Sequence, residues 1–349
     1  MDRELLEQTL AELGQPSYRA KQVWEHACAG IGSYEEMSSL PKGLRTELTG
    51  RVPFSTLSLE QQLEASDGTV KALFRTHDGH PVESVLMRYR DGRRSVCIST
   101  QSGCPLNCTF CASGQMGFKR NLTAWEIFDQ ALYFRQIEQV NHGALMGMGE
   151  PLMNLTAVLT AVRALPDLGI GHRHTSVSTA GWVPGIDQLA AEGIPLRLAL
   201  SLHAPDDELR RTLMPVTARF PIAAVIAACE RFYALRRRKV LVEYLMLAGV
   251  NDRPEQARAL GRLLDPGRFK LNLIPYNETV GGLGAFRASS RPVIYSFRET
   301  LAKAGLEATV RVARGREIEA ACGQLAGGSG TAAHTAKDRP AASPSRRSM

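Results

Sequence analysis

The sequence predicts an α/β protein built on a parallel sheet, with a small helical domain before it and a disordered tail after it. Between residues 95 and 312, short apolar or β-branched runs alternate with helical stretches at the spacing of repeated βα units. Six or seven such units over about 230 residues fit a full or partial barrel slightly better than an open sheet. The chain has 349 residues, 44% of them hydrophobic, which is enough for one large core or two modest ones.

The first part of the chain is predicted to be helical. Four leucines between positions 5 and 13 are spaced for one face of a helix, and a second amphipathic stretch runs from Tyr18 to Cys28. We assign residues 1–52 to a helical accessory domain. A strand-rich connector follows at residues 53–94, where Pro53 and other turn residues separate short apolar runs.

Residues 95–326 are predicted to form the barrel core. The expected strands are at residues 95–99, 144–148, 174–178, 196–202, 240–247, 270–274 and 308–312. The expected helices are at residues 124–139, 155–164, 184–191, 222–235, 254–264 and 292–304. The remaining residues, 327–349, are rich in Gly, Ala, Ser and Pro and show no apolar period, so we expect them to be disordered.

Charge and hydropathy narrow the class of protein. The formal charge of +7, from 42 Lys and Arg against 35 Asp and Glu, suggests a polyanionic partner. The chain has no uncharged apolar run long enough for a membrane span, and we expect no membrane association. The N-terminus lacks the basic region and apolar core of a signal peptide, which favours a cytoplasmic protein without a disulfide framework.

Three of the seven cysteines lie within eight residues of one another. Cys104, Cys108 and Cys111 form a C-x3-C-x2-C arrangement directly after a predicted strand. A zinc site normally has four ligands, commonly from two C-x2-C pairs, and no second pair is present. Three thiolates on a short loop instead suit a cubane iron–sulfur cluster with one iron open to a ligand. We interpret Cys28 and Cys229, on apolar helix faces, as core residues.

The cysteine motif, with Phe110 before its last cysteine, resembles the radical S-adenosylmethionine (SAM) superfamily. From about residue 10 to 327 the chain resembles one family more narrowly, the RlmN adenosine carbon-2 RNA methyltransferases, whose sibling Cfr modifies carbon 8. The resemblance is carried by residues 16–23, 96–99, 117–122, 146–151, 201–205, 272–277 and 320–325. It implies a partial (βα)6 radical SAM barrel.

The resemblance also implies the cofactors and the catalytic residues. The cofactors are a 4Fe–4S cluster on Cys104, Cys108 and Cys111, and two SAM molecules per turnover. Carbon 2 of adenine has no nucleophilic lone pair, so the cofactor must supply radical reactivity. In the family's scheme Cys322 accepts a methyl group, and a 5′-deoxyadenosyl radical removes hydrogen from it. The methylene radical then adds to adenine, Cys97 releases the product as a disulfide, and Glu83 accepts the adenine proton.

Seven further residues match the family's SAM contacts. Most fall at the ends of predicted strands, which in a parallel barrel converge on the face where active sites form. For His203, a hydrogen-bonded, partly buried histidine is the alternative interpretation. The expected contacts are Gly149, Glu150, Ser178, Ser201, Leu202, His203 and Asn277.

The resemblance implies 23S rRNA and tRNA as substrates, a reducing electron donor such as flavodoxin, and a monomer. The helical accessory domain is then an RNA-binding domain. Clustered basic side chains are candidates for phosphate contacts, although each could equally be a solvated surface group. The candidates are Arg88, Arg90, Arg93, Arg94, Lys119, Arg120 and the run from Arg236 to Lys239.

Three other functions stay open on the sequence. The carbon-8 sibling shares all five functional cysteines. A radical SAM enzyme acting on a protein or metabolite would need neither Cys97 nor Cys322, and a non-catalytic iron–sulfur RNA-binding protein would release no deoxyadenosine. The chain also departs from the family before Cys322: residues 315–319 are less acidic than the family's segment, because Arg316 puts a positive charge where a negative one is common. This departure bears on the expected substrate preference.

Overall fold

The computed structural model describes residues 1–278 and 286–326, so the predicted disordered tail lies outside the described residues. Its main sheet has ten strands in the order β1-β2-β3-β4-β7-β8-β9-β10-β11-β12, and β5 and β6 form a separate pair. The strands are β1 (Leu57–Glu64), β2 (Val70–Thr76), β3 (Pro81–Arg88), β4 (Arg94–Cys97), β5 (Gln101–Ser102), β6 (Arg120–Asn121), β7 (His142–Leu145), β8 (Thr175–Thr179), β9 (Arg197–Ser201), β10 (Val240–Met246), β11 (Phe269–Pro275) and β12 (Ala308–Val310).

The helices lie close to their predicted positions. The α-helices are α1 (Arg3–Glu12), α2 (Tyr18–Cys28), α3 (Lys42–Arg51), α4 (Ala112–Gln115), α5 (Ala124–Ile137), α6 (Leu155–Ala164), α7 (Val183–Ala191), α8 (Asp207–Leu213), α9 (Ile222–Arg236), α10 (Pro254–Leu263) and α11 (Arg291–Lys303). Short 3-10 helices are η1 (Pro151–Met153), η2 (Leu165–Leu168), η3 (His172–His174), η4 (Pro215–Ala218) and η5 (Arg316–Ile318).

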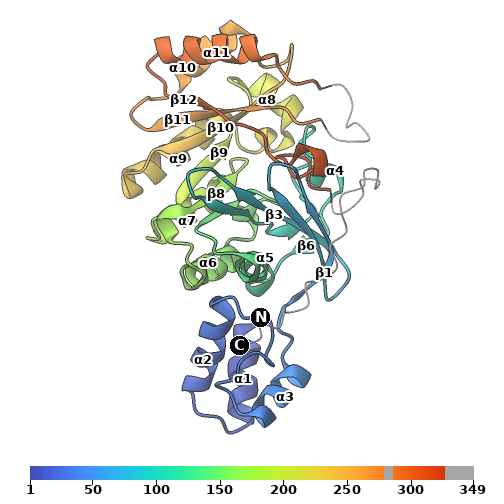
Figure 1. Ribbon diagram of the computed structural model, residues 1–349. Coiled ribbons are helices and arrows are strands. Elements are labelled where there is room, and N and C mark those ends of the chain that lie inside the picture. The colour runs from blue at the N-terminus through green and yellow to red at the C-terminus, as the bar shows by residue number, and fades with distance from the viewer. Residues whose placement is uncertain (279–285, 327–349) are drawn as a thin grey trace.

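The strands from β4 to β12 form the predicted partial (βα)6 barrel. In the sheet order β4-β7-β8-β9-β10-β11-β12 every neighbouring pair is parallel, and α5, α6, α7, α9, α10 and α11 make the successive crossovers. Figure 1 shows these helices along one side of the curved sheet. Parallel strands need such crossovers, and the helices cover an apolar face of the sheet. In the part of the chain that the structure describes, no helix is long and apolar enough to cross a membrane.

The segment before the barrel extends the same sheet. β1, β2 and β3 are antiparallel, and β3 pairs antiparallel with β4 in a register that sets Val85 opposite Cys97. This pairing places Glu83, on β3, in the strand next to Cys97. Residues 57–88 are thus continuous with the barrel sheet, and the domain boundaries stay a prediction.

The N-terminal segment docks on α5 through Trp24 and through the buried N-terminal ammonium group of Met1, which pairs with Asp129 of α5. Trp24, which is 4% exposed, stacks on Phe128 with ring centroids 4.9 Å apart and meets Trp125 edge-on at 5.5 Å. Its indole N–H donates a hydrogen bond of 2.7 Å to Asp167 Oδ2 in η2. Figure 1 shows α1, α2 and α3 gathered at one end of the molecule, beyond α5 and α6. One large aromatic side chain therefore carries much of this contact.

We expect Trp24→Ala to lower the free energy of unfolding by about 3–5 kcal/mol, the range for truncating a buried aromatic side chain. Trp24→Phe keeps a ring against Phe128 but loses the hydrogen bond to Asp167, so its loss should be smaller. Urea denaturation of both variants measures the difference. Equal stability of the alanine variant and the wild type would contradict the importance of this contact.

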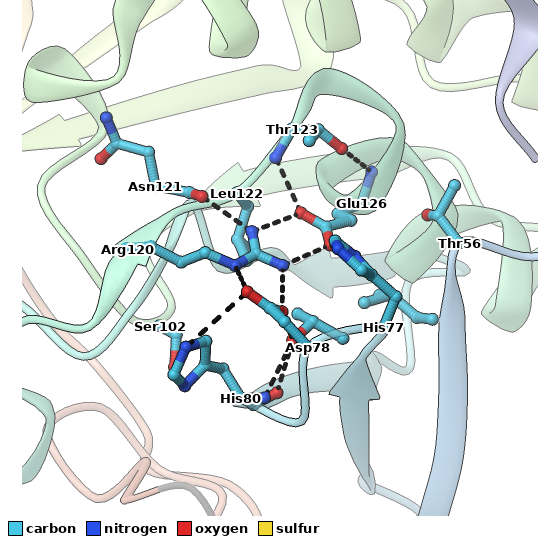
Figure 2. A network of polar contacts seen from close by, with 12 residues as sticks. Thr56, His77, Asp78, His80, Ser102, Arg120, Asn121, Leu122, Thr123 and Glu126 are labelled. Carbon is cyan, nitrogen blue, oxygen red and sulfur yellow. Dashed lines mark hydrogen bonds and ion pairs between the residues drawn. The ribbon is translucent and has the colours of Figure 1, made fainter.

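A second tie joins the β2–β3 turn to the start of α5. Arg120 donates from Nη1 and Nη2 to the two carboxylate oxygens of Glu126, at 2.8 and 2.7 Å. The same guanidinium donates to Asp78 from Nε at 2.7 Å and from Nη2 at 2.8 Å, as Figure 2 shows. Glu126 also forms a capping box with Thr123, which fixes the first turn of α5. Arg120 is therefore committed to a partly buried network in which only the side chain of Glu126 is fully buried.

We expect Arg120→Ala to destabilise the protein by about 3–5 kcal/mol, because it leaves the carboxylate of Glu126, whose side chain is 1% exposed, without its cation. Lys119→Ala is the matched control. The exposed Lys119 side chain makes no hydrogen bond or ion pair with the described residues, so its loss should change stability by less than about 0.5 kcal/mol. Thermal unfolding measures the stability of both variants. An equal loss of stability in the two would contradict the importance of this network.

Candidate functional site

The three clustered cysteines share the loop between β5 and α4. All three pack against an apolar cluster that includes Leu106 and Phe110 from the loop itself. Asn107, between the first two cysteines, has a φ of 50°, a left-handed conformation that turns the loop back on itself. The ring of Phe110 meets His203 edge-on at 4.8 Å, which joins the loop to the end of β9.

The surroundings of the three thiols suit a group that binds thiolates. Burial raises the pKa of Cys104 to about 12 and that of Cys108 well above its ordinary value. The negative charge of a neighbouring thiolate raises both pKa values as well. Burial raises the pKa of Cys111 too, while N–H groups of Ser113 and Gly114 at the start of α4 oppose it. Forming three thiolates here is costly unless a positively charged group binds them.

The arrangement fits a cluster better than a single ion. Among residues 1–278 and 286–326, no three His, Cys, Asp or Glu side chains converge on a point that one metal ion could occupy. In a cubane cluster each thiolate binds a different iron, which separates the ligands, and N–H groups directed at the sulfurs tune it. Cys104, Cys108 and Cys111, which pack against apolar side chains, could thus hold a 4Fe–4S cluster.

The glycine-rich loop after β7 packs tightly against the chain leaving β4. Gly149 has a φ of 102°, and a Cβ on it would lie 2.6 Å from Cβ of Gln101. Glu150 is buried, and its two carboxylate oxygens accept backbone N–H groups of Leu152 at 3.1 Å and Ala180 at 2.7 Å. Burial raises the pKa of Glu150 to about 7. This carboxylate ties the ends of β7 and β8 together.

A buried arginine holds the ends of β8 and β9. Arg210, on α8, is 0% exposed and donates to the backbone oxygens of Ala180 at 2.6 Å, Ser201 at 3.1 Å and Leu202 at 3.1 Å. Burial lowers the pKa of Arg210 to about 10. These bonds satisfy carbonyl groups where the strands end and fix the edge on which the expected SAM contacts lie.

His203 follows β9 as a neutral, hydrogen-bonded side chain. Its Nδ1 accepts a hydrogen bond of 3.0 Å from the N–H of Leu245, and burial, helped by Arg210, lowers its pKa to about 3. His203 also has a φ of 59°. The structure thus shows the hydrogen-bonded, buried histidine named above as the alternative interpretation, and its role toward SAM stays a prediction.

Cys97 and Cys322 line one cavity together with Cys111, the third cysteine of the loop. Cys97 lies at the end of β4, and its carbonyl accepts a hydrogen bond of 2.7 Å from Ser84 Oγ. The pKa of Cys97 is raised to about 12, mainly by burial. The neighbouring Cys322 thiol also raises this pKa, whereas Arg311 lowers it. The two cysteines that are 225 positions apart in sequence therefore face the same space as the third cysteine of the loop.

The segment that carries Cys322 is held by the turn between β1 and β2. Glu317 accepts the N–H of Ser66, and the N–H of Gly315 donates to Asp67 Oδ2 at 3.2 Å. Lys71 Nζ donates to the carbonyl of Glu319 at 3.4 Å. We call these contacts the hairpin clasp.

Two other contacts hold the same segment from the opposite side. Asn277, after β11, donates from Nδ2 to the Cys322 carbonyl at 3.3 Å and accepts from Arg316 Nε at 2.8 Å. The N–H of Ala112, next to Cys111, donates to the Gly323 carbonyl at 2.9 Å. Arg316, the departure from the family pattern, thus orients the side chain of Asn277 beside Cys322.

Glu83 is buried on β3 and touches the chain just beyond Cys322. Its carboxylate lies 3.1 Å from Lys71 Nζ and accepts the N–H of Ala326 at 2.7 Å. Glu83 does not line the cavity that Cys97 and Cys322 share. Its role as the proton acceptor stays a prediction.

The seven expected SAM contacts do not all meet in that cavity. Asn277 lines it, whereas the others lie along the carboxyl edge of the strands, outside its lining. Leu202 is fully buried in the main core, because its side chain packs under the sheet edge. The six residues outside the cavity lining are Gly149, Glu150, Ser178, Ser201, Leu202 and His203.

Several of the basic side chains considered for phosphate contact are bound to protein groups instead. Arg88 and Arg94 both pair with Glu138, and Arg94 Nε lies 2.7 Å from its carboxylate. Arg120 belongs to the network of Figure 2. Arg93 pairs with Asp91, while Arg236 and Arg238 donate to backbone carbonyls. Among the candidates for phosphate contact, four exposed side chains make no hydrogen bond or ion pair with described residues: Arg90, Lys119, Arg237 and Lys239.

Sequence reasoning missed four charged residues of this region. Lys71 and Asp67 reach the Cys322 segment from a hairpin about 250 positions earlier, so no local pattern links them to it. Arg210 reads as an ordinary surface residue on a short polar helix. Arg311 stands in a predicted strand among apolar residues, and that mismatch was the one signal that could have drawn attention to it.

We expect Gly315→Ala to loosen the hairpin clasp. Gly315 has a φ of 62°, and a Cβ there would lie 2.8 Å from both Thr69 Cγ2 and Ala320 Cβ. Since such strain costs about 1–3 kcal/mol, hydrogen exchange of the Ser66 amide, which donates to Glu317, should quicken about tenfold or more. Gly43→Ala, whose added Cβ would meet nothing within 4 Å, should leave that exchange unchanged. Identical Ser66 exchange in both variants would contradict the clasp.

Comparison with known proteins agrees with this geometry. The model of the Radical SAM superfamily matches residues 98–260. The chain is 46% identical to a probable dual-specificity RNA methyltransferase RlmN of Symbiobacterium thermophilum, over 93% of this chain and 90% of that protein. It is 43% identical to the protein of the same description from Thermus thermophilus, over 93% of each chain.

A solved structure leads to the same family. The crystal structure of a radical SAM methyltransferase from Sphaerobacter thermophilus is similar, with a TM-score of 0.89 and 42% identity, over 94% of this chain and 98% of that one. The likeness therefore spans the N-terminal helices, the sheet and the Cys322 segment together. The chain belongs to the RlmN family of radical SAM RNA methyltransferases.

Proposed function

We propose that this enzyme methylates carbon 2 of an adenosine in 23S rRNA and in tRNA, through a methyl group carried on Cys322. The observation that carries the proposal is the cavity that Cys97 and Cys322 share with the cluster ligand Cys111. A radical enzyme that attacked its substrate directly would need no thiol pair beside the cluster. The description of its relatives as dual-specificity RNA methyltransferases supports two classes of RNA substrate.

The cofactors are a 4Fe–4S cluster and SAM, as for the superfamily. When bound, they supply a methyl group for Cys322 and, by a one-electron transfer that is later reversed, the radical that takes a hydrogen atom from that methyl group. Cys104, Cys108 and Cys111 hold the cluster. The edge formed by Gly149, Glu150, Ser178, Ser201, Leu202, His203 and Asn277 binds SAM.

Cys97 completes the reaction by attacking the Cys322 sulfur. A disulfide forms between the two sulfurs, and the carbon–sulfur electron pair leaves with the carbon now attached to adenine, which takes a proton to become a methyl group. Glu83 accepts the proton lost from carbon 2. The Ala326 N–H and the Lys71 ammonium group bound to Glu83 place this carboxylate next to the segment that carries Cys322.

The N-terminal helices and a few basic side chains are the parts of the protein that we assign to RNA binding. The helical domain, residues 1–52, is an accessory RNA-binding domain on the 53–94 connector and the 95–326 core. Arg90, Lys119, Arg237 and Lys239 are the basic side chains left for phosphate contact. We place the enzyme in the cytoplasm as a monomer that takes electrons from a donor such as flavodoxin.

The decisive experiment compares RNA from the wild type and a deletion strain. Nuclease-digested ribosomal and transfer RNA, analysed separately by mass spectrometry, should each lose 2-methyladenosine in the deletion strain. Unchanged 2-methyladenosine with loss of 8-methyladenosine would instead assign the carbon-8 activity. Loss in one RNA class alone would restrict the substrate to that class.

We expect the purified Cys97→Ala enzyme to accumulate a covalent protein–RNA adduct, because the thiol that breaks the carbon–sulfur bond is gone. Cys322→Ala should form neither adduct nor methylated RNA, since no sulfur carries the methyl group. Cys229→Ala, in the core on α9, serves as the control and should methylate RNA without an adduct. Denaturing gels and mass spectrometry detect the adduct. Full activity of Cys322→Ala would contradict the scheme and favour direct radical attack on the substrate.

A further inference from the structure

Arg311 is a charged residue in the shared cavity that the steps above leave without a role. It directly follows β12, and its N–H donates to the Leu273 carbonyl of β11 at 2.8 Å, which fixes its backbone at the carboxyl edge of the sheet. Its side chain lines the cavity together with Cys97 and Cys322. The position therefore comes from the sheet itself rather than from a loose loop.

The Arg311 guanidinium has Cys322 as its strongest electrostatic neighbour. The interaction with Cys322 raises the pKa of Arg311, and Glu243, Tyr89 and Cys97 act in the same direction, while burial opposes them. Arg311 is thus a permanent cation next to the sulfur that carries the methyl group.

The hydrogen-bond donors of this guanidinium are unused. In residues 1–278 and 286–326, the Arg311 side chain makes no hydrogen bond and no ion pair with another side chain. The other arginine of the cavity, Arg314, has protein partners for its charge, because it stacks over Tyr89 at 4.6 Å and lies 3.9 Å from Asp67, although its Nε is buried without a hydrogen-bond partner among the described residues. A guanidinium offers five N–H donors and no acceptor, so a ligand that meets Arg311 must present acceptor atoms.

We propose that Arg311 donates a hydrogen bond to a ring nitrogen, N1 or N3, that flanks the reacting carbon of the substrate purine. The inference rests on the proposed function. The carbon on the Cys322 sulfur becomes bonded to carbon 2, so both flanking nitrogens come within three bonds of that sulfur. Arg311 is then a cation of the same cavity, close to two acceptor atoms of the kind its donors require.

Such a bond would assist the reaction as well as orient the base. As the new carbon–carbon bond forms, electron density shifts from carbon 2 onto the neighbouring nitrogens. A fixed positive donor stabilises that density, and it does so best in a site shielded from water. Arg311 would contact the substrate at the reacting ring, and the choice of flanking nitrogen would help select carbon 2.

The test pairs enzyme variants with altered RNA. The holoenzyme and its Arg311→Met and Arg311→Lys variants are compared on an RNA hairpin that carries adenosine, 1-deazaadenosine or 3-deazaadenosine at the target position. On the adenosine RNA, Arg311→Met should lower kcat/KM about 10- to 100-fold, the effect of losing a hydrogen bond from a charged donor. On the deaza RNA that lacks the partner nitrogen, the same substitution should cost almost nothing further. Arg311→Lys should recover part of the loss.

Two further measurements separate a specific loss of the hydrogen bond from a general loss of folding or binding. Dissociation constants for the same pairs should show the same pattern and remain measurable if a deaza RNA is not methylated. Methylation of Cys322 without RNA, followed as a mass increase of the protein, should still go to completion in Arg311→Met, which verifies folding and cofactor binding. Its rate can fall, because Arg311 is a strong electrostatic neighbour of Cys322. Arg314→Met is the control, and whatever change it causes should be the same factor on all three RNAs.

Equal losses for Arg311→Met on all three RNAs would overturn the proposal, and so would a complete loss of Cys322 methylation, because Arg311 would then be required for the reaction of the thiol rather than for the purine. Failure of the proposed function would look different. The wild-type enzyme would then form no 2-methyladenosine on the unmodified RNA.

Discussion

The site depends on the hydrogen bonds that hold the Cys322 segment against the β1–β2 hairpin. Without them the chain after β12 would have no reason to cross back toward β4, since β12 and β4 lie six strand pairings apart in the sheet. Asp67 and Ser66 bind this segment from the hairpin, and Asn277 binds it from the end of β11. These contacts bring Cys322 from the far end of the sheet to Cys97.

Buried charges at the carboxyl edge serve mainly to fix backbone groups. Arg210 satisfies carbonyls at the ends of β8 and β9, and Glu150 satisfies N–H groups after β7 and β8. Each ion loses its hydration on burial, and the hydrogen bonds offset that loss only while the strand ends stay in place. The edge is therefore rigid. Arg311 differs from both, because its charge faces the cavity and binds no side chain of the described protein.

The N-terminal helices and the β1–β3 extension of the sheet are both anchored on helix α5 of the barrel. Trp24 seats the N-terminal helices on α5, and Arg120 ties the β2–β3 turn to the first turn of the same helix. One helix of the barrel thus anchors both the accessory domain and the extension of the sheet. This use of Arg120 also explains why a basic side chain next to the cluster loop is not free for phosphate, whereas its exposed neighbour Lys119 is.

The sequence by itself determined the repeated βα units and drew attention to the three clustered cysteines, because hydrophobic period and cysteine spacing are local properties of the chain. Cys97 and Cys322 were singled out by the family resemblance. Only the tertiary structure decided that Cys97, Cys111 and Cys322 share a cavity, that Asp67 and Lys71 hold the last of these segments, and that Arg311 faces it with unused donors. The physical reason is distance along the chain. Contacts between residues up to about 250 positions apart leave no periodic pattern in either segment, and a charged side chain reveals its partners only when the fold brings them together.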